Sequence, residues 1–147
     1  MAQFGNGVTW QFDPDKVLSQ TPSYGAAIGS VVSLDFSGPQ IDLLDSTVHG
    51  ESWRTRVAGL KDGGTASITV RFQTNDATHK AIRDAQGVLC AHKFEFPKAV
   101  STNATPFSWA NDAIIENYSI NAPHDGLLEM TVSLQLSGPP TFVEEAA

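Results

Sequence analysis

The segment Thr65-Ala-Ser-Ile-Thr-Val-Arg-Phe-Gln73 decides the fold class, because apolar and polar side chains alternate along its whole length. Its apolar members are Ala66, Ile68, Val70 and Phe72, and every residue between them is polar. Alternation with a period of two over these nine residues predicts a β-strand that has one face in the core and the other in a polar environment.

A second long strand is predicted nearer the C-terminus. Its apolar face consists of Leu128, Met130, Val132, Leu134 and Leu136. The strand follows the turn Pro123-His-Asp-Gly126, in which Asp-Gly favours a tight hairpin, and it stops at Gly138-Pro-Pro140. The region 113–140 is therefore predicted to be a strand, a turn and a returning strand.

One helix is predicted between these two strands. Asn75 or Asp76 caps its start, Gly87 follows its end, and the helix reaches about Gln86. Its buried stripe consists of Ala77, Ala81, Ile82 and Ala85. Small residues on this stripe would let the helix lie close against a sheet.

Shorter strands are predicted around these elements, over 28–36, 40–44, 92–98, 107–110 and 113–121. Six to eight strands with one helix indicate a mainly β fold, an antiparallel β-sandwich or small barrel with one flanking α-helix. A length of 147 residues fits a single domain over 1–147.

Three stretches lack a sustained period. Residues 1–27, with Phe4, Trp10, Phe12 and Tyr24, are predicted to form an N-terminal arm with one short edge strand, and 139–147 a short C-terminal tail. Residues 45–64 are predicted to form an extended loop. A loop this long is usually functional or disordered. Because its Trp53, Arg54 and Arg56 are residue types enriched at interface hot spots, a contact role competes with a mobile excursion.

The charge balance limits the partners. The net charge is −7, the pI is about 4.8, and Lys and Arg are not clustered. A protein that grips nucleic acid needs basic residues to replace the counterions of the phosphates, so this function is excluded. A surface past which DNA slides remains possible.

Cys90 is the single cysteine, which excludes an internal disulfide. The start of the chain has neither the basic nor the apolar region of a signal peptide, and the sequence has no run of 18 apolar residues. We therefore expect folding in a cytosol, without a membrane partner.

The sequence predicts no catalytic, metal or cofactor site. The four histidines have no metal-ligand spacing, and the chain lacks a phosphate loop and a nucleophile elbow. His124-Asp125 is the only adjacent His-carboxylate pair. Because Asp before Gly stabilises a hairpin turn, we interpret this pair as part of the turn and the protein as a non-enzyme.

The polar faces of the two long strands carry few charges. They consist of Thr65, Ser67, Thr69, Arg71 and Gln73 on one strand and Glu129, Thr131, Ser133, Gln135 and Ser137 on the other. One interpretation is ordinary solvated surface. The other is that strand edges pair between subunits and that the polar face lines an enclosed space.

The order of these features resembles the major tail tube proteins of long-tailed, lambda-type siphoviruses over residues 28–142. The resemblance rests on Val57-Ala-Gly-Leu-Lys-Asp-Gly-Gly64 entering a strand, one helix, and a last hairpin with Tyr118-Ser-Ile-Asn-Ala-Pro123 and Val132-Ser-Leu-Gln-Leu-Ser-Gly138. Ala58 departs from the pattern, since a proline commonly precedes the glycine.

The resemblance implies a fold shared with the type VI secretion tube protein, and hexameric rings whose sheets join into one barrel. Rings would stack into a hollow tube in the virion tail, assembled in the host cytoplasm, and DNA would pass through the lumen without specific binding. Tape-measure, tail terminator and tip proteins would be further partners, and no cofactor is implied.

The resemblance also implies roles for two groups of residues. The inter-ring contact loop would use Trp53, Arg54, Arg56, Leu60, Lys61 and Asp62. The lumen or inter-subunit sheet face would use Thr65, Ser67, Thr69, Arg71, Glu129, Thr131, Ser133 and Gln135.

Three alternatives stay open. The first is a type VI secretion-like tube protein. The second is a carbohydrate-binding β-sandwich, which would need exposed aromatic side chains on a sheet face, whereas Trp10, Trp53 and Trp109 fall in predicted loops or near termini. The third is a hydrolase that uses His124 and Asp125.

Overall fold

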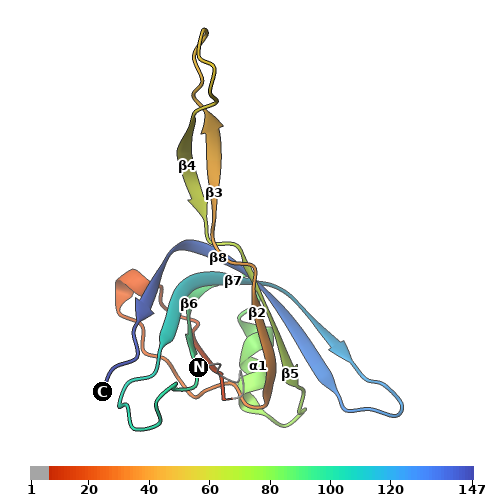
Figure 1. The fold of residues 1–147 in the computed structure, drawn as a ribbon. Helices are drawn as coiled ribbons and strands as arrows, with labels where there is room; N and C mark the ends of the chain where they lie inside the picture. The colour runs from red at the N-terminus through yellow and green to blue at the C-terminus, as the bar shows by residue number, and fades with distance from the viewer. Residues whose placement is uncertain (1–6) are drawn as a thin grey trace.

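A computed structural model of the chain describes residues 7–147, so Phe4 of the predicted N-terminal arm lies outside the described residues. The main element is a six-stranded antiparallel sheet with the order β1-β6-β7-β8-β5-β2, which curls around the core (Figure 1). Its strands are β1 (Thr9–Asp13), β2 (Val31–Phe36), β5 (Thr65–Arg71), β6 (Leu89–Glu95), β7 (Ser108–Asn121) and β8 (Glu129–Val143). A two-stranded sheet pairs β3 (Gln40–Asp45) with β4 (Arg56–Asp62).

The predicted mainly β fold with one helix is confirmed, and β5 and β8 are its centre. They pair antiparallel from Thr65↔Gln135 to Arg71↔Glu129. The alternating apolar residues within β5 and β8 point inward, whereas the predicted Leu128 precedes β8 and is 38% exposed. On β5, Ala66, Ile68 and Val70 are at most 2% exposed. Met130, Val132, Leu134 and Leu136 on β8 are at most 4% exposed. Hydrophobic burial on one face of each strand therefore sets this register.

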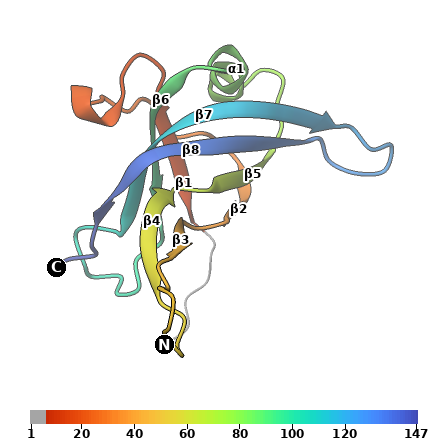
Figure 2. The same ribbon diagram turned by 90° about the horizontal axis from the view of Figure 1, so that it is seen from above.

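The helix α1 (Ala77–Asp84) starts where its cap was predicted and ends two residues before Gln86. The carboxylate of Asp76 accepts a hydrogen bond from the backbone N–H of Thr78 at 2.9 Å, which satisfies one free donor of the first turn. His79 and Ile82 are buried beneath the sheet. Figure 2 shows α1 beside the long ribbons of β7 and β8.

The expected short edge strand of the N-terminal arm is β1, but it belongs to the core. Trp10 pairs with Phe94 and Phe12 with His92 in the register with β6. The indole of Trp10 is fully buried and stacks on the rings of Phe94 and His92. Two aromatic side chains at i and i+2 are the inward face of this short strand. After β1 come the 3₁₀ turn η1 (Leu18–Gln20) and a connection to β2.

The predicted extended loop over 45–64 is wrong as secondary structure. β3 and β4 form a hairpin that stands out from the six-stranded sheet, and only residues 46–55 connect the two strands (Figure 1). Neither strand alternates simply, because the register shifts between Ile41 and Leu43. In addition, no core covers either face, so β4 shows no amphipathic period.

The predicted tail over 139–147 is mostly a continuation of β8, which pairs with β7 as far as Val143↔Ser108. A register shift opposite Ala110 and Asp112 accommodates Gly138-Pro-Pro140 inside the strand. Beyond the strand, the Glu145 carboxylate accepts hydrogen bonds from the backbone N–H groups of Ala99 and Val100, both at 3.0 Å. The C-terminal residues thus fix the loop that follows β6.

Other predicted boundaries also shift. The expected strands over 107–110 and 113–121 are one strand, β7, and β6 begins three residues earlier than the predicted 92–98. Trp109 is therefore in a strand, not a loop, and its indole stacks on Phe36 with ring centroids 4.3 Å apart.

Candidate assembly surfaces

The eight residues predicted for a lumen or inter-subunit face lie together on one face of the sheet. Register places them opposite one another as Thr65↔Gln135, Ser67↔Ser133, Thr69↔Thr131 and Arg71↔Glu129. Their side chains point away from the buried face of β5 and β8, because successive residues of a strand point to opposite sides. We call the outward side of β7, β8, β5 and β2 the polar face.

The polar face continues across the two flanking strands, which the sequence reading did not include. On β2, Ser33 lies opposite Thr69 and Asp35 opposite Ser67. On β7, Asn117, Ser119 and Asn121 lie opposite Ser133, Thr131 and Glu129. Only the register of the sheet reveals these neighbours, because β2 pairs with β5 across the intervening β3–β4 hairpin and a register shift between Ile115 and Asn117 interrupts the alternation of β7.

Charges on the paired rows of the polar face nearly cancel. Arg71 Nη1 lies 3.3 Å from Glu129 Oε1. Among the residues that pair across the sheet in line with Asn117, Ser119 and Asn121 of β7, Asp35 is the remaining charged side chain. Hydroxyl and amide groups make up the rest. Such a face is wettable and offers no cluster of cations to a phosphate backbone.

The β3–β4 hairpin is the second surface. It exposes Trp53 by 82% and Leu60 by 83%, and more apolar side chains follow its length. These further exposed side chains are Ile41, Leu43, Leu44, Val48 and Val57. Contiguous exposed apolar residues of this kind mark interaction sites on soluble proteins.

The six residues predicted for inter-ring contacts all lie on this hairpin and are all exposed. They are not one cluster. Trp53 and Arg54 lie in the connection at the tip, whereas Leu60, Lys61 and Asp62 lie at the base of β4. Arg54 Nε is 3.9 Å from Asp45 Oδ2. The apolar residues of β3 were missed, because the sequence reading gave them to a short return strand.

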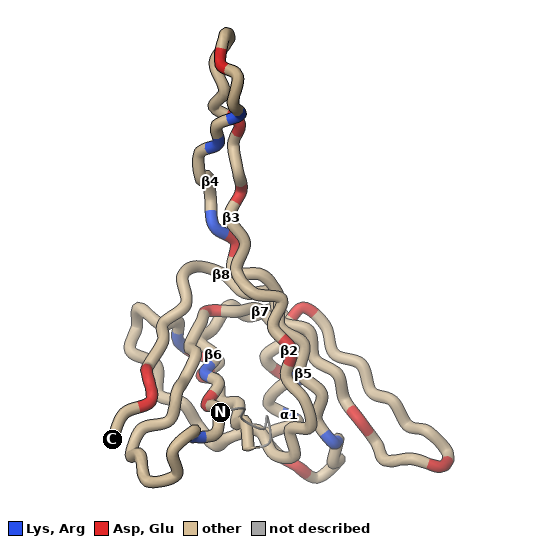
Figure 3. The backbone as a smooth tube through the Cα atoms, in the orientation of Figure 1, with Lys and Arg blue, Asp and Glu red and all other residues tan. Residues whose placement is uncertain are grey.

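Close backbone contacts fix the base of the hairpin. The hydroxyl oxygen of Ser37 accepts a hydrogen bond from the Thr65 N–H at 2.8 Å. Gly64 has a φ of +85°, and a Cβ added there would lie 2.5 Å from the carbonyl oxygen of Gly38. Only glycine fits this crossing of the chain. Figure 3 shows the hairpin leaving the curled sheet with acidic and basic residues along its length.

The histidines do not form a reactive site. The side chains of His124 and Asp125 are 99% and 96% exposed in the turn between β7 and β8. Burial lowers the pKa of His92 to about 3 and raises the pKa of the neighbouring Cys90 thiol to about 12, so both stay neutral in the core. Among residues 7–147, no three His, Cys, Asp or Glu side chains are grouped to hold a metal ion.

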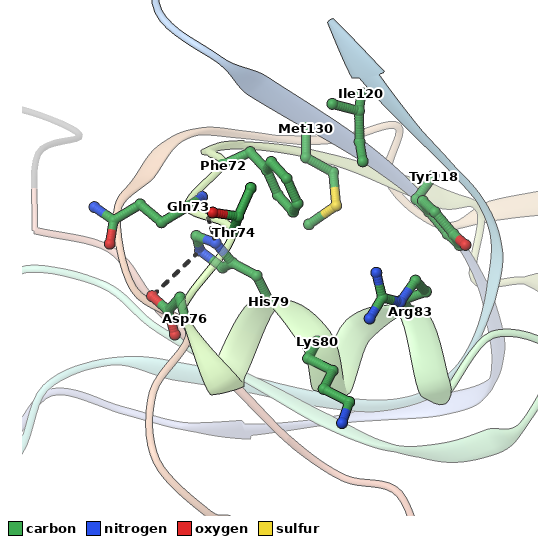
Figure 4. Close-up of a pocket in the computed structure, with 10 residues that line it drawn as sticks. All are labelled: Phe72, Gln73, Thr74, Asp76, His79, Lys80, Arg83, Tyr118, Ile120 and Met130. Atoms are coloured by element: carbon green, nitrogen blue, oxygen red, sulfur yellow. Dashed lines mark hydrogen bonds and ion pairs between the residues drawn. The ribbon is translucent and has the colours of Figure 1, made fainter. Parts of the chain in front are cut away.

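The pocket between α1 and the β7–β8 strands is also structural (Figure 4). His79 Nδ1 accepts a hydrogen bond from the Gln73 N–H at 3.1 Å, so Nε2 is the donor to the Gly29 carbonyl at 2.8 Å. Both ring nitrogens are therefore engaged. The enclosed volume of about 30 Å³ suits a water molecule rather than a substrate.

The described part of the chain contains no helix that is long and apolar enough to cross a membrane.

The carbohydrate-binding alternative loses support, because Trp10 is fully buried and Trp109 is stacked on Phe36. Trp53 is exposed on the hairpin and not on the face of the main sheet.

Comparison with known proteins gives a fold. No family model matches the chain, and no curated protein matches it in sequence. Solved structures do match. The SPP1 tail tube superimposes with a TM-score of 0.69 at 18% identity, covering 99% of this chain and 81% of that one.

The chain has the tail tube fold.

Two other structures extend this result. The tail of a gene transfer agent particle matches with a TM-score of 0.70 at 17% identity, over 97% of this chain and 99% of that one. The tube-terminating cap of the anti-feeding prophage matches with a TM-score of 0.67 at 9% identity, over 98% of this chain and 94% of that one. The resemblance found in the sequence is thus confirmed for the fold.

Proposed function

We propose that the chain is the structural subunit of a bacteriophage tail tube. It polymerises as stacked hexameric rings into a hollow tube in the virion tail, which conducts genomic DNA during ejection. The observation that carries this proposal is the polar face, which spans four adjacent strands and ends at an open backbone edge on either side.

The first open edge is β2, which pairs only with β5 in the described structure. The second is the distal part of β7. β6 pairs with β7 no further than Ile114, so from Asn117 to Asn121 the strand has β8 on one side alone. Unpaired edges are templates for pairing with another chain, and neither edge carries the lysines that commonly block this.

Strand direction supports a closed ring. In the sheet order β7, β8, β5, β2, each strand is antiparallel to its neighbour. The fourth strand, β2, therefore runs opposite to the first, β7. Rotation about an axis parallel to the strands keeps the direction of every strand. A second copy related in this way brings its β7 antiparallel to β2 of the first, and cyclic symmetry closes the sheet into a barrel without edges. The number six comes from the resemblance.

The polar face would line the bore. Its near-neutral hydroxyls and amides, on a chain of net charge −7, give DNA no phosphate-binding site, so passage stays fast. Tape-measure, terminator and tip proteins are expected as partners at the ends of such a tube.

The hairpin would connect the rings. Stacked rings of one polarity bring the projecting end of each subunit to the opposite end of a subunit in the next ring. The exposed Trp53 and the apolar residues of β3 and β4 would then be covered by that neighbour.

A shortened hairpin tests this proposal. Asp45 and Arg56 are cross-strand partners, so residues 46–55 can be replaced by Asn-Gly, a turn that two-residue hairpins favour. We expect an unchanged circular dichroism spectrum and, by electron microscopy, single rings in place of the tubes that the intact chain forms. Tubes of normal length from the shortened chain would contradict the inter-ring role.

A further inference from the structure

The open edge of β7 carries two side chains that its own subunit covers only in part, the half-buried Tyr118 and the exposed Ile120. Tyr118 and Ile120 lie opposite Val132 and Met130, on the inward side of the sheet. Met130 is 1% exposed, but Ile120 is 46% exposed. In Figure 4 both β7 side chains lie on the strands above α1, at the margin of the pocket that α1 forms with them.

The open edge of β2 borders a groove of about 260 Å³ between the beginnings of β1 and β2. Val8, Leu34 and Phe96 line it, together with Val32, which is 48% exposed. Leu34 lies opposite the fully buried Ile68 and therefore also points inward. The groove lies along the second edge, and Leu34 lines it on the side that faces the subunit core.

Both edges share one requirement when they pair. A strand that joins the sheet must keep its core-facing side chains on the side of the sheet that faces the subunit core. A slip of one residue would turn every side chain of the strand to the other face. Ser119 would join the polar face, next to Ser33 and Asp35 of the adjacent copy. Tyr118 and Ile120 would then arrive on the same side as Leu34, which is where the groove lies.

We propose that Tyr118 and Ile120 on β7 of one copy fill the groove beside β2 of the next copy in the ring. This inference rests on the proposed function and adds the residues that hold neighbouring subunits together. A second copy is the occupant because its β7 edge carries apolar residues in phase with Leu34 of β2. The backbone hydrogen bonds would join the sheets, and the apolar contact would fix their register.

The first test compares two Asp substitutions in the full chain. Ile120→Asp places a charge in the contact, whereas Val143→Asp places one at an apolar residue of nearly equal exposure, 47%, at the far end of β8. We expect both variants to fold by circular dichroism. Ring and tube formation should fall at least about tenfold for Ile120→Asp, because a buried unpaired charge is costly, and stay unchanged for Val143→Asp. Normal rings from a folded Ile120→Asp variant would overturn the inference.

The second test is cross-linking, which does not depend on a destabilising change. Cys90 is first replaced by Ala to remove the native thiol, and Leu34→Cys is then combined with Ile120→Cys or with Tyr118→Cys. Oxidation of the assembled protein should give a ladder of disulfide-linked oligomers with at least one of these pairs. Leu34→Cys with Ser119→Cys, which point to opposite faces, should give none.

The two tests separate this inference from the proposed function. Rings that form without a ladder from either inward pair would overturn the proposed contact and leave the tube function standing. A chain that forms no rings at all would overturn both.

Discussion

At the scale of single residues, Trp10 and Trp53 show how the same residue type serves two purposes. The indole Nε1–H of Trp10 donates to His92 Nδ1 at 3.1 Å inside the core, whereas Trp53 is 82% exposed at the tip of the hairpin. The first side chain stabilises the subunit. The second contributes little to a single subunit and is available to a neighbour.

Truncation of Trp10 should therefore weaken the folded subunit, whereas truncation of Trp53 should weaken only the assembly. Trp10→Ala leaves a large cavity and should lower the free energy of unfolding by about 3–5 kcal/mol in urea denaturation. Trp53→Ala should change it by less than about 0.5 kcal/mol while reducing tube length in electron micrographs. A large loss of stability for Trp53→Ala would place this side chain in the subunit core and contradict its assignment.

His92 should make stability depend on pH. Its folded pKa of about 3 lies below the ordinary value of 6.5, so the unfolded chain binds the proton more readily than the folded one. Its contribution is present in full above pH 6.5 and is lost as the pH falls towards 3. The difference in free energy of unfolding between the wild type and His92→Gln should narrow by about 1 kcal/mol per pH unit as the pH is lowered from 6.5 to 5. The same gap at pH 7 and pH 5 would show that His92 does not titrate in this way.

At the scale of elements, sequence reading succeeded where one face of an element meets the core. β5 and β8 alternate because burial selects apolar residues on one side only, and α1 carries a recognisable cap at Asp76. The strand predicted over 40–44 is β3, but β4 and its pairing with β3 were missed, because both faces of the hairpin are exposed in the subunit and no period marks β4. Its exposed apolar residues are the ones that we propose to contact the next ring.

The base of the hairpin gives a prediction about glycine. Gly64→Ala would bring a Cβ to 2.5 Å from Gly38 O in addition to the strain of its positive φ. Gly50→Ala carries a similar φ of +95° with no atom within 4 Å, and it serves as the matched control. Thermal unfolding should show a clearly larger destabilisation for Gly64→Ala, by about 1–3 kcal/mol. Equal effects of the two substitutions would mean that the chain crossing at the base is not tight.

The C-terminal residues give a second prediction at this scale. Hydrogen bonds from Val100 N–H, Ala99 N–H and the Asn103 amide lower the pKa of Glu145. At pH values above the ordinary carboxyl pKa the Glu145 carboxylate keeps these hydrogen bonds in full. Their contribution is lost as the pH falls through the lowered pKa of Glu145. Glu145→Gln should speed amide hydrogen exchange at residues 99–103 at pH 7, while exchange in β5 stays unchanged. Equal exchange in both chains would show that the carboxylate does not hold the loop.

At the scale of the whole molecule, the sequence analysis predicted the fold class and the alternation that gives β5 and β8 one apolar and one polar face. It could not predict how far the polar face extends, because β2 pairs with β5 across the intervening β3–β4 hairpin and a register shift between Ile115 and Asn117 interrupts the alternation of β7. It also could not locate the open edges, since an edge is defined by which strand is missing beside it. These two features are what turn a curled sheet into a candidate ring subunit.

Electron microscopy of the purified full chain, followed by reconstruction of the particles, would show directly whether the subunits form a tube. We predict rings or hollow tubes in which the polar face of β2, β5, β8 and β7 lines the bore and the β3–β4 hairpin reaches the adjacent ring. A chain that stays monomeric at every salt concentration would overturn the proposed tube, and a tube whose bore is lined by another surface would overturn the role of the polar face.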